Sequence, residues 1–557
     1  MIRLGNFKTV SDSVNTVVDI NILKPGVNSI KNHFIVLDGK KNVLHVIDKI
    51  CDHAGGRLIH KGDHAVCPMH GWKLDLSTLK YQDSHSEKSS AEYSIDNGKL
   101  LIADNESYLE NPYRDSDNHL EVNFRFLNHA TVAIYFNGIT LITDPWLFGP
   151  AFMTGWWLDQ PSTEDSIEIL KNADYIFISH NHPDHLHSET LELLKKDKKF
   201  IVGNFNSKST EKYLKSLGFI NVDALEFNSI YQISNNFNLS ILKSGDFRDD
   251  SGLYLNLGGI EILLTVDANI LNSLVLPRNI DLLMTSFAGG ASGFPLCFEN
   301  YDLDQKLRVI ERNKLAIKSS VGAYIKATQP KYYMPYAGMF KEKAERDSFI
   351  KINNSKNSPK DYENLATKLG ANYVDPQKNI LYKFLDKRLN RVELNLQHLP
   401  HDNINLYIKN LKNSFKYNSG TVIEYMRHSG FKGKQIVYIL PSNDDFSEII
   451  NEIVYCNFDS QIFKVVNESD INLNIPEFRT MKLLVRQEVF ASIITNKLPW
   501  EDFSIGFQMR IEREPNSYES DFWYHFTNVY IDPIHYKFSP NCGTCNLINQ
   551  NPFFLQK

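Results

Sequence analysis

The chain has 557 residues, a mass of 64.1 kDa, a formal net charge of −6 and a pI near 6.3. It is too long for one hydrophobic core, so several domains are expected. The mildly acidic balance gives no reason to expect nucleic acid as a partner. No basic segment followed by an apolar one opens the chain, and no apolar run approaches the roughly 18 residues of a membrane span. The sequence therefore predicts a cytoplasmic protein.

The first part of the chain, residues 1–105, alternates apolar and polar positions between turn signals. An example is NHFIVLDGKKNVLHVID, with Asp38-Gly39 at a hairpin turn. This pattern predicts a small antiparallel β domain. The polar segment 103–118 has few apolar residues and predicts a linker that ends the domain.

Within this β domain, four side chains of metal-binding type stand in two pairs. Cys51 and His53 form the first pair, in CDHAGG, and Cys67 and His70 form the second, in CPMHGW. A zinc ribbon takes two cysteines from one loop, whereas here each loop offers one cysteine and one histidine. A Rieske [2Fe–2S] cluster needs this arrangement, because its cysteines bind one iron and its histidines the other. The pattern predicts such a cluster, with a zinc site as the alternative.

Residues 119–385 combine strand patterns with helical patterns. Strands are predicted over residues 122–129, 131–136, 139–144, 175–179, 201–205, 253–257, 260–267 and 280–287, and helices over 165–173 and 187–197. The dipeptides Asn137-Gly138 and Gly258-Gly259 predict hairpins, so we expect an α/β domain with mixed sheets. The run NNSKNSPK at 353–360 predicts an exposed loop.

The remaining residues, 391–557, predict a third region of α/β type. It contains a helical pattern over 405–415 and a strand pattern over 506–514. Two of the six cysteines, Cys542 and Cys545, form a CxxC pair near the end of the chain. Nothing nearby supplies the other half of a metal site, so we expect a peripheral role or none. The cysteines outside the predicted cluster form no disulfide framework, which is typical of a reducing compartment.

A second group of metal-binding residues follows the predicted strand 175–179. The segment ISHNHPDHLH supplies His180, His182, Asp184 and His185. Alternate histidines can point to one metal while the aspartate and the next histidine turn toward a neighbouring position. This order resembles the metallo-β-lactamase superfamily, whose αββα fold holds one or two metals at a sheet edge.

The resemblance to that superfamily extends to two carboxylates and then departs from it. Asp144 and Asp267 stand at strand ends where the superfamily has a structural acid and a metal-bridging carboxylate. Two later histidines have no counterpart, because 242–250 and 331–340 contain none. What remains is close to the two-His-one-carboxylate set of iron(II) oxygenases, with Asp267 or Asp184 as carboxylate and Asp246 as a further candidate. We expect non-haem iron there, with zinc as the alternative.

A Rieske cluster passes single electrons, so a second metal beside it implies a reaction that consumes electrons. Long segments along nearly the whole chain then resemble the vertebrate-type CMP-N-acetylneuraminate hydroxylase family. Besides CDHAGG, CPMHGWKLDLSTLKY and ISHNHPDH, they are DPWLFGPAFMTGWWL, SFAGGASGFP, PYAGMF, IGFQMRIEREP and FWYHF. The resemblance implies a multidomain α+β protein: an N-terminal Rieske β domain (1–105), an αββα metallo-β-lactamase-like catalytic domain (119–385) and a C-terminal α/β region (391–557).

The same resemblance implies a monooxygenase. Its reaction would hydroxylate the N-acetyl methyl of CMP-N-acetylneuraminic acid to N-glycolyl, with O2 and electrons from cytochrome b5 and its NADH reductase or from a ferredoxin. The residues expected to form the catalytic iron site are His180, His182, Asp184, His185 and Asp267. The cluster loops are expected to pack toward the mouth of the catalytic domain, within one chain or across a homo-oligomer.

Three sets of residues are candidates for contact with the substrate: Trp156 and Trp157; Gly289, Gly290 and Ser292; and Arg510 and Arg513. The paired tryptophans could stack on cytosine or cover the sugar. The small residues could bring backbone amides close to a phosphate. The two arginines are taken to share one strand face and to meet a phosphate or carboxylate. Each set also has a structural interpretation: core packing, a tight turn and a solvated face.

Other functions stay open at this point. The same chemistry could act on another nucleotide-activated nonulosonate. A zinc hydrolase with the Rieske domain as a redox switch belongs to a different class, and an electron-transfer module without catalysis leaves the second metal unexplained. Iron at both sites would favour the oxygenase, whereas zinc at the second site would favour the hydrolase.

Overall fold

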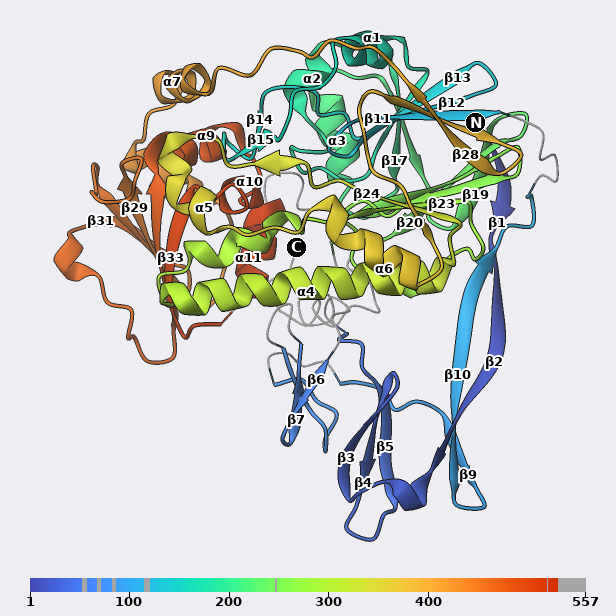
Figure 1. The fold of residues 1–557 in the computed structure, drawn as a ribbon. Helices are drawn as coiled ribbons and strands as arrows, with labels where there is room; N and C mark the ends of the chain where they lie inside the picture. The colour runs from blue at the N-terminus through green and yellow to red at the C-terminus, as the bar shows by residue number, and fades with distance from the viewer. Residues whose placement is uncertain are drawn as a thin grey trace.

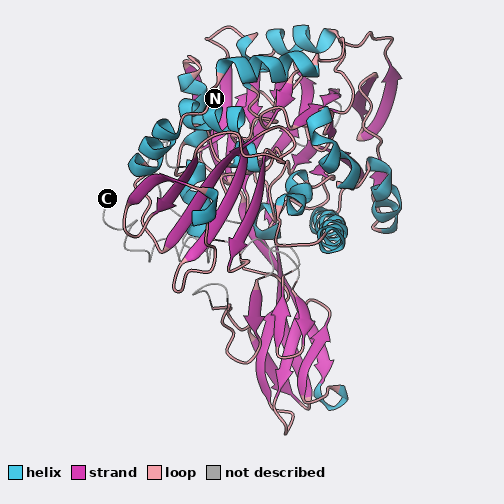
Figure 2. Cartoon of the chain, turned by 90° about the vertical axis from the view of Figure 1, so that its left-hand side faces the viewer, coloured by secondary structure: helices cyan, strands magenta, loops and turns pink. Residues whose placement is uncertain are grey.

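The structure is a computed structural model that describes residues 1–52, 58–67, 72–82, 87–114, 121–245, 248–517 and 519–528. Figure 1 shows a large body from which a small β part projects on a two-stranded ribbon, and Figure 2 shows the same separation from the side. His53, His70, Asp246, Cys542 and Cys545 lie outside the described residues. The predicted multidomain α+β fold class is confirmed.

The N-terminal β part consists of three antiparallel three-stranded sheets, ordered β2-β10-β9, β3-β4-β5 and β6-β7-β8. Their strands are β2 (Lys8–Asp19), β3 (Gly26–Ile30), β4 (His33–Leu37), β5 (Val43–Asp48), β6 (Ile59–Lys61), β7 (His64–Val66), β8 (Lys73–Asp75), β9 (Tyr93–Asp96) and β10 (Lys99–Glu110), with the 3₁₀ turn η1 (Ile20–Ile22). Phe34, Ile47 and Leu74 are among its buried core residues.

The ribbon corrects the predicted linker. β2 and β10 pair without interruption from Lys8↔Glu110 to Asp19↔Lys99, so the segment 103–118 continues a strand as far as Glu110. Lys8, Thr9 and Ser11 are exposed. Leu100 and Ile102 are buried in the N-terminal β part and Leu109 in the body, but the polar run 103–107 between them lacks the apolar alternation that identifies most strands.

The body is built on two mixed eight-stranded sheets. One has the order β1-β19-β20-β21-β22-β23-β24-β26, with β1 (Ile2–Asn6), β19 (Ser229–Ser234), β20 (Phe237–Lys243), β21 (Ser251–Leu257), β22 (Ile260–Leu264), β23 (Leu282–Ser286), β24 (Tyr332–Tyr336) and β26 (Asn372–Tyr373). The other has the order β18-β17-β16-β13-β12-β11-β27-β28, with β11 (Val122–Asn128), β12 (Thr131–Phe136), β13 (Ile139–Thr143), β16 (Tyr175–Ile178), β17 (Lys199–Gly203), β18 (Asn221–Leu225), β27 (Ile380–Leu385) and β28 (Arg388–Glu393).

The strand pairing places both ends of this body outside the predicted 119–385. β1 pairs with β19, so residues 2–6 belong to a sheet of the body and not to the N-terminal β part. β28 pairs with β27, which pairs with β11, so the sheet continues to Glu393. β1 could not be assigned to its sheet from local sequence, because its partner β19 lies far along the chain.

Helices cover the outer faces of the two sheets, giving the αββα layers. They are α1 (Asp165–Asn172), α2 (Ser188–Glu192) and α3 (Ser209–Ser216) on one side and α4 (Leu303–Thr328), α5 (Ser348–Asn353) and α6 (Glu363–Lys368) on the other. Phe177 of β16 packs between the sheets, whereas its neighbours Ile176 and Ile178 pack with the helices. This alternation along one strand buries both of its faces.

Short elements connect these layers. They are the small sheet β14 (Pro150–Ala151), β15 (Trp156–Leu158) and β25 (Phe340–Lys341) and the 3₁₀ turns η2 (Leu271–Leu274), η3 (Gly290–Cys297), η4 (Glu345–Asp347) and η5 (Pro359–Tyr362). The predicted exposed loop 353–360 is partly buried: Asn354 is 9% exposed and hydrogen-bonds Glu342, and Asn357 bonds Tyr362. Its polar residues pack inward because they have buried partners.

The C-terminal region is a mixed five-stranded sheet of order β31-β30-β29-β32-β33 with its own core. Its strands are β29 (Gln435–Ser442), β30 (Ile453–Asn457), β31 (Ile462–Val466), β32 (Arg479–Arg486) and β33 (Met509–Glu514), and its helices are α7 (Ile404–Ser414), α8 (Ser419–His428), α9 (Gln487–Asn496), α10 (Glu501–Ser504) and α11 (Ser520–Asn528), with the turn η6 (Glu468–Asp470). The aromatic-rich segment near the end forms the helix α11.

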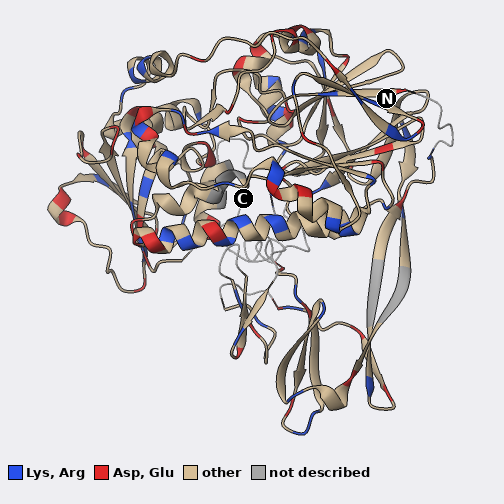
Figure 3. Cartoon of the chain, viewed as in Figure 1, with Lys and Arg blue, Asp and Glu red and all other residues tan. Residues whose placement is uncertain are grey.

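Charges are interspersed over the body in Figure 3, with Lys and Arg outnumbering Asp and Glu along α4. No described helix is both long and apolar enough to cross a bilayer. α4 has 26 residues, and its charges continue from its first turn to its last.

A buried ion pair attaches the C-terminal region to the body. Arg486, at the end of β32, is 0% exposed and donates to Asp347 Oδ1 at 2.6 Å. It also donates to the carbonyl oxygen of Arg346 at 2.7 Å and to that of Asp444 at 2.8 Å. Because Arg346 and Asp347 belong to η4 of the body, this guanidinium joins the two parts.

Replacement of Arg486 by Met should markedly lower the thermal stability of the protein. Asp347 would remain as a buried carboxylate without its cation, and loss of one partner of a buried pair costs about 3–5 kcal/mol. Differential scanning calorimetry measures the effect. The control is Arg427→Met, which removes an exposed pair with Glu424 worth about 0–1 kcal/mol. Equal shifts in the two variants would contradict the structural role of Arg486.

Candidate metal centre

The four residues of the motif lie in the loop that leaves the end of β16 and leads into α2. His180, Asp184 and His185 are at most 1% exposed, and the side chain of His182 is 15% exposed. Asp267 follows β22 of the other sheet, so the two sheets meet at this edge. The fold thus brings together all five predicted catalytic residues.

The distances between inward-facing atoms fit metal coordination. His180 Nε2 lies 3.0 Å from His182 Nδ1. His185 Nε2 lies 3.4 Å from Asp184 Oδ2 and 3.5 Å from Asp267 Oδ2. The set His180, His182, Asp184 and the set His180, His185, Asp267 each offer atoms within 4.8 Å of one another. Ligands about 2.0–2.2 Å from one metal are separated by such distances.

Each of these three histidines uses its other ring nitrogen for an outward hydrogen bond. His180 Nδ1 lies 2.9 Å from Ser179 Oγ, and His185 Nδ1 lies 3.1 Å from Asp144 Oδ2. His182 Nε2 lies 3.1 Å from Glu501 Oε2. Metal-binding histidines almost always have such a partner, because it fixes the tautomer and the ring orientation. These three histidines therefore have the arrangement of metal ligands: one ring nitrogen faces the site and the other is hydrogen-bonded outward.

Asp144 holds the residues around the metal-binding histidines in place. It is 0% exposed and accepts hydrogen bonds from Ser179 N at 2.7 Å and Ser179 Oγ at 2.8 Å, besides its contact with His185. Burial raises its pKa, and the contacts with His185 and Ser179 oppose that rise. Its φ of +38° is unusual for a residue with a side chain. Such strain clusters at functional sites, where surrounding contacts hold it.

Two buried atoms are the test of whether these residues fit a metal. Among the described residues, His185 Nε2 and Asp184 Oδ1 have no hydrogen-bond partner. Burial alone would raise the pKa of Asp184, but His185 and the hydrogen bond from His129 lower it well below its usual range. A buried imidazole nitrogen and a carboxylate oxygen that lack partners are costly unless a cation occupies the space between them. The donor set therefore fits a bound metal.

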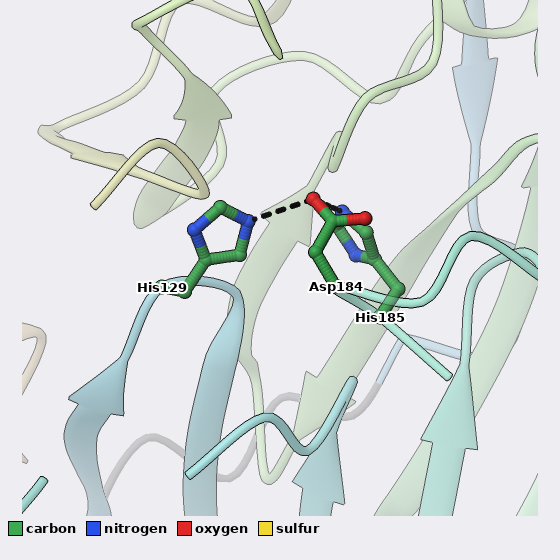
Figure 4. A group of neighbouring side chains, drawn as sticks. All are labelled: His129, Asp184 and His185. Atoms are coloured by element: carbon green, nitrogen blue, oxygen red, sulfur yellow. Dashed lines mark hydrogen bonds and ion pairs between the residues drawn. The ribbon is translucent and has the colours of Figure 1, made fainter. Parts of the chain in front are cut away.

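The sequence analysis missed His129, which lies in the turn between β11 and β12. Figure 4 shows its ring directed at the Asp184 carboxylate, with Nε2 3.2 Å from Oδ2. Its φ is +42°, and among the described residues its buried Nδ1 has no hydrogen-bond partner. His129 thus lacks the outward bond of the other three histidines and is placed to donate to Asp184. The sequence offered one signal for His129: it is a histidine where one predicted strand ends and the next begins.

Asp250 was also missed. Residues 242–250 contain no histidine, but Asp250 Oδ1 lies 4.0 Å from His180 Nε2. Its other oxygen forms an ion pair with Arg248, 3.0 Å from Nη2. A carboxylate in that place supplies an oxygen donor where the related fold has an imidazole. Asp246, the predicted further carboxylate, lies outside the described residues.

The predicted substrate residues are carried by elements that contact one another: Trp156 shares a buried cluster with Ala288 and Leu296, and Arg510 Nη1 lies 4.0 Å from Cys297 Sγ of η3. Trp156 and Trp157 are 2% and 1% exposed, and Trp156 stacks on Phe340 with ring centroids 3.6 Å apart. Gly289 has a φ of +73° and precedes η3, which contains Gly290 and Ser292. The tryptophans therefore occupy a core position, and the glycine turn has the conformation that only glycine adopts easily.

The prediction that Arg510 and Arg513 share a strand face is wrong. Side chains alternate along β33, so a spacing of three residues puts them on opposite faces. The Arg510 guanidinium lies 4.2 Å from the Phe446 ring centroid, whereas that of Arg513 lies 4.4 Å from the Phe298 ring centroid.

At the predicted cluster, the structure describes the two cysteines. Cys51 and Cys67 are 1% and 0% exposed and belong to the same small core. Lys88, which sequence analysis did not single out, is 3% exposed and holds the first loop through Asp48 Oδ1 at 3.1 Å and Asp52 Oδ1 at 3.0 Å. Two buried thiols suit cluster ligation. Their partners His53 and His70 are outside the described residues.

Comparison with known proteins identifies the domains and the family. Residues 16–94 match the family model of the Rieske [2Fe-2S] domain, and residues 123–273 match that of the beta-lactamase superfamily domain. Cytidine monophosphate-N-acetylneuraminic acid hydroxylase of Danio rerio is 30% identical over 91% of this chain and 92% of its own. The chain belongs to the cytidine monophosphate-N-acetylneuraminic acid hydroxylase family. The Macaca mulatta member is 28% identical over 91% of this chain and 92% of its own.

Membership of the hydroxylase family confirms the resemblance seen in the sequence and identifies the chain as a Rieske-type iron-dependent monooxygenase. Among solved structures, CmlA, a diiron beta-hydroxylase from Streptomyces venezuelae, aligns with 17% identity over 49% of this chain and 54% of its own, with a TM-score of 0.32. The Rieske domain carries a [2Fe–2S] cluster, and the β-lactamase-like domain has a metal site.

Replacement of His185 by Ala should remove metal from the second site and leave the Rieske spectrum unchanged, because the two sites lie in separate cores. Metal analysis of the purified variants measures the loss. His398→Ala is the control. That histidine is exposed, and its Nδ1 hydrogen-bonds the carbonyl oxygen of Pro161, away from the proposed ligands. Full metal occupancy in the His185 variant would show that the centre lies elsewhere.

Metal affinity at the second site should rise with pH between about 6.5 and 9. Burial lowers the pKa of His182, but the hydrogen bond and charge of Glu501 outweigh it and raise that pKa to about 9. Below that pH a metal must displace a proton from His182, so affinity should gain about tenfold per pH unit. Competition with a chelator at several pH values measures it. An affinity independent of pH would argue against His182 as a ligand.

Proposed function

We propose that this enzyme hydroxylates the N-acetyl methyl of CMP-N-acetylneuraminic acid to give CMP-N-glycolylneuraminic acid. The observation that carries the proposal is the presence, in one chain, of a Rieske domain and a buried group of imidazoles and carboxylates. The names of the relatives supply the substrate. Hydrolysis consumes no electrons, whereas the activation of O2 at a metal consumes electrons that a one-electron cluster can deliver.

The reaction balances as a monooxygenation. A methyl C–H bond and the O–O bond break, a C–O bond forms, and the second oxygen atom leaves as water after taking up two electrons and two protons. We propose that the electrons come from NADH through cytochrome b5 and its reductase, or from a ferredoxin, and pass through the Rieske cluster. The Rieske ligands would be Cys51, His53, Cys67 and His70.

At the second site, the proposed ligands are His180, His182, Asp184, His185 and Asp267, with Asp250 beside them. Imidazoles with carboxylates suit non-haem iron. When bound there, iron supplies the activation of O2. The protein's part is to hold the donors: Asp144 and Ser179 fix the rings of His185 and His180, and His129 orients Asp184. The exposed edges of His182 and Asp267 give access from solvent.

We propose roles for two sets of residues beside the metal centre. The buried tryptophans Trp156 and Trp157 would act by shaping the site from behind, since they offer almost no surface. Arg248 lies nearer to the metal ligands than the predicted arginines, with its side chain 29% exposed and Nη2 3.3 Å from the carbonyl oxygen of Asp267. We propose it as the cation nearest to an anionic substrate.

The proposed activity is tested by reconstitution with iron without oxygen, followed by chemical reduction and addition of O2 with CMP-N-acetylneuraminic acid. Mass spectrometry should find a product heavier by one oxygen atom, taken from labelled O2. His182→Ala should form no product while keeping the Rieske spectrum. If only a different CMP-activated nonulosonate is oxidised, that compound and not CMP-N-acetylneuraminic acid is the substrate. Cleavage of the substrate without O2 would show that the protein is a hydrolase and not an oxygenase.

A further inference from the structure

The metal-binding loop has a contact with a segment 319 residues away. Glu501, the first residue of α10 in the C-terminal region, places Oε2 3.1 Å from His182 Nε2. The side chain of Glu501 is 35% exposed and that of His182 is 15% exposed, so the contact sits at the rim of the site. Neither the β-lactamase superfamily match nor the Rieske match includes Glu501.

The geometry of the imidazole ring defines what this contact can do. The two ring nitrogens of His182 point in different directions, and Nδ1 faces His180 Nε2 at 3.0 Å. Nδ1 is therefore the nitrogen on the metal side, and Nε2 is on the far side. A carboxylate that accepts from Nε2–H keeps the proton there and leaves the Nδ1 lone pair for a metal.

His182 differs in this respect from the other two ligand-type histidines. His180 and His185 find their outward partners in Ser179 and Asp144, which belong to the same domain. Only His182, among these three, takes its partner from the C-terminal region. The orientation of its ring therefore depends on how the two parts pack together.

That packing is closely constrained around α10. A Cβ added to Gly155 would lie 2.2 Å from the carbonyl oxygen of Gly506, and one added to Gly506 would lie 2.2 Å from the carbonyl oxygen of Phe152. Such distances leave room for no side chain, so the two backbones are in direct contact. Phe507 belongs to a core cluster of the body, and the Phe152 ring lies 5.8 Å from that of His182.

The other side of α10 is anchored in the C-terminal core. Trp500 precedes it, is 0% exposed and donates from Nε1 to Tyr425 OH at 2.9 Å. α10 is therefore held between two cores, one on each side of Glu501. The carboxylate reaches His182 from a fixed support and not from a free loop.

We propose that Glu501 is a positioning residue of the metal centre. It holds the ring of His182 with Nδ1 toward the metal, and it makes the C-terminal region a part of the catalytic site. This inference rests on the proposed metal centre, but not on the identity of the substrate.

Two substitutions separate positioning from mere packing. In Glu501→Gln, the amide oxygen still accepts from His182 Nε2–H, so cobalt(II) affinity and the cobalt absorption spectrum of the second site should stay close to those of the unaltered protein. In Glu501→Leu, the acceptor is lost, and cobalt(II) affinity should fall by about 10–100-fold, the usual loss for such a partner, with a changed spectrum. Both variants should keep the Rieske spectrum.

A matched control is available in the same region. Glu424 of α8 lies 3.8 Å from His428 Nδ1 and has a side chain that is 54% exposed, but it contacts none of the proposed metal ligands. Glu424→Leu should leave cobalt binding unchanged. These measurements need no substrate, so they can succeed even if CMP-N-acetylneuraminic acid is not the substrate.

Three results would overturn the inference. Unchanged cobalt(II) affinity and spectrum in Glu501→Leu would show that His182 needs no partner. Equal losses in the Gln and Leu variants, with lowered thermal stability in both, would assign Glu501 a structural role only. Failure of the unaltered protein to bind cobalt(II) at the second site would show that the proposed metal centre does not exist, whatever the result on turnover.

Discussion

The outward hydrogen bonds of three imidazoles are the interaction on which the functional part of this structure depends. A partner on one imidazole nitrogen fixes the tautomer and the ring so that the other nitrogen faces the metal, and here Ser179, Asp144 and Glu501 are those partners. These partners come from the end of β16, the end of β13 and α10. The orientation of the three rings therefore depends on one sheet of the body and on the C-terminal region.

The same requirement explains features that would otherwise be unfavourable. His129, Asp144 and Val266 have positive φ angles, and Asp144 is a fully buried carboxylate. Each is tolerated because the fold around it is extensive enough to hold it. The fully buried Arg486, and the contact between Gly155 and Gly506, serve the same end at a distance. They fix the C-terminal region against the body and so place Glu501.

Local patterns predicted much of this protein. The hairpins at Asn137-Gly138 and Gly258-Gly259 and the helix over 404–414 follow from turn chemistry and periodicity. The segment 103–118 is predicted as a linker because its polar residues 103–107 carry no alternating pattern, but as far as Glu110 it continues β10. The prediction that Arg510 and Arg513 share a strand face failed, because side chains alternate along a strand and residues three apart point to opposite faces.

By itself, the sequence determined the motifs whose ligands are close together along the chain: the two Cys/His pairs and the cluster from His180 to His185. Spacing within a loop limits which atoms can converge, so chemistry could be inferred from it. Only the tertiary structure decided which distant residues complete the site. His129, Asp250 and Glu501 reach it from a turn, a strand start and another region of the chain. No local pattern encodes that meeting, because it results from the packing of two sheets and a third core.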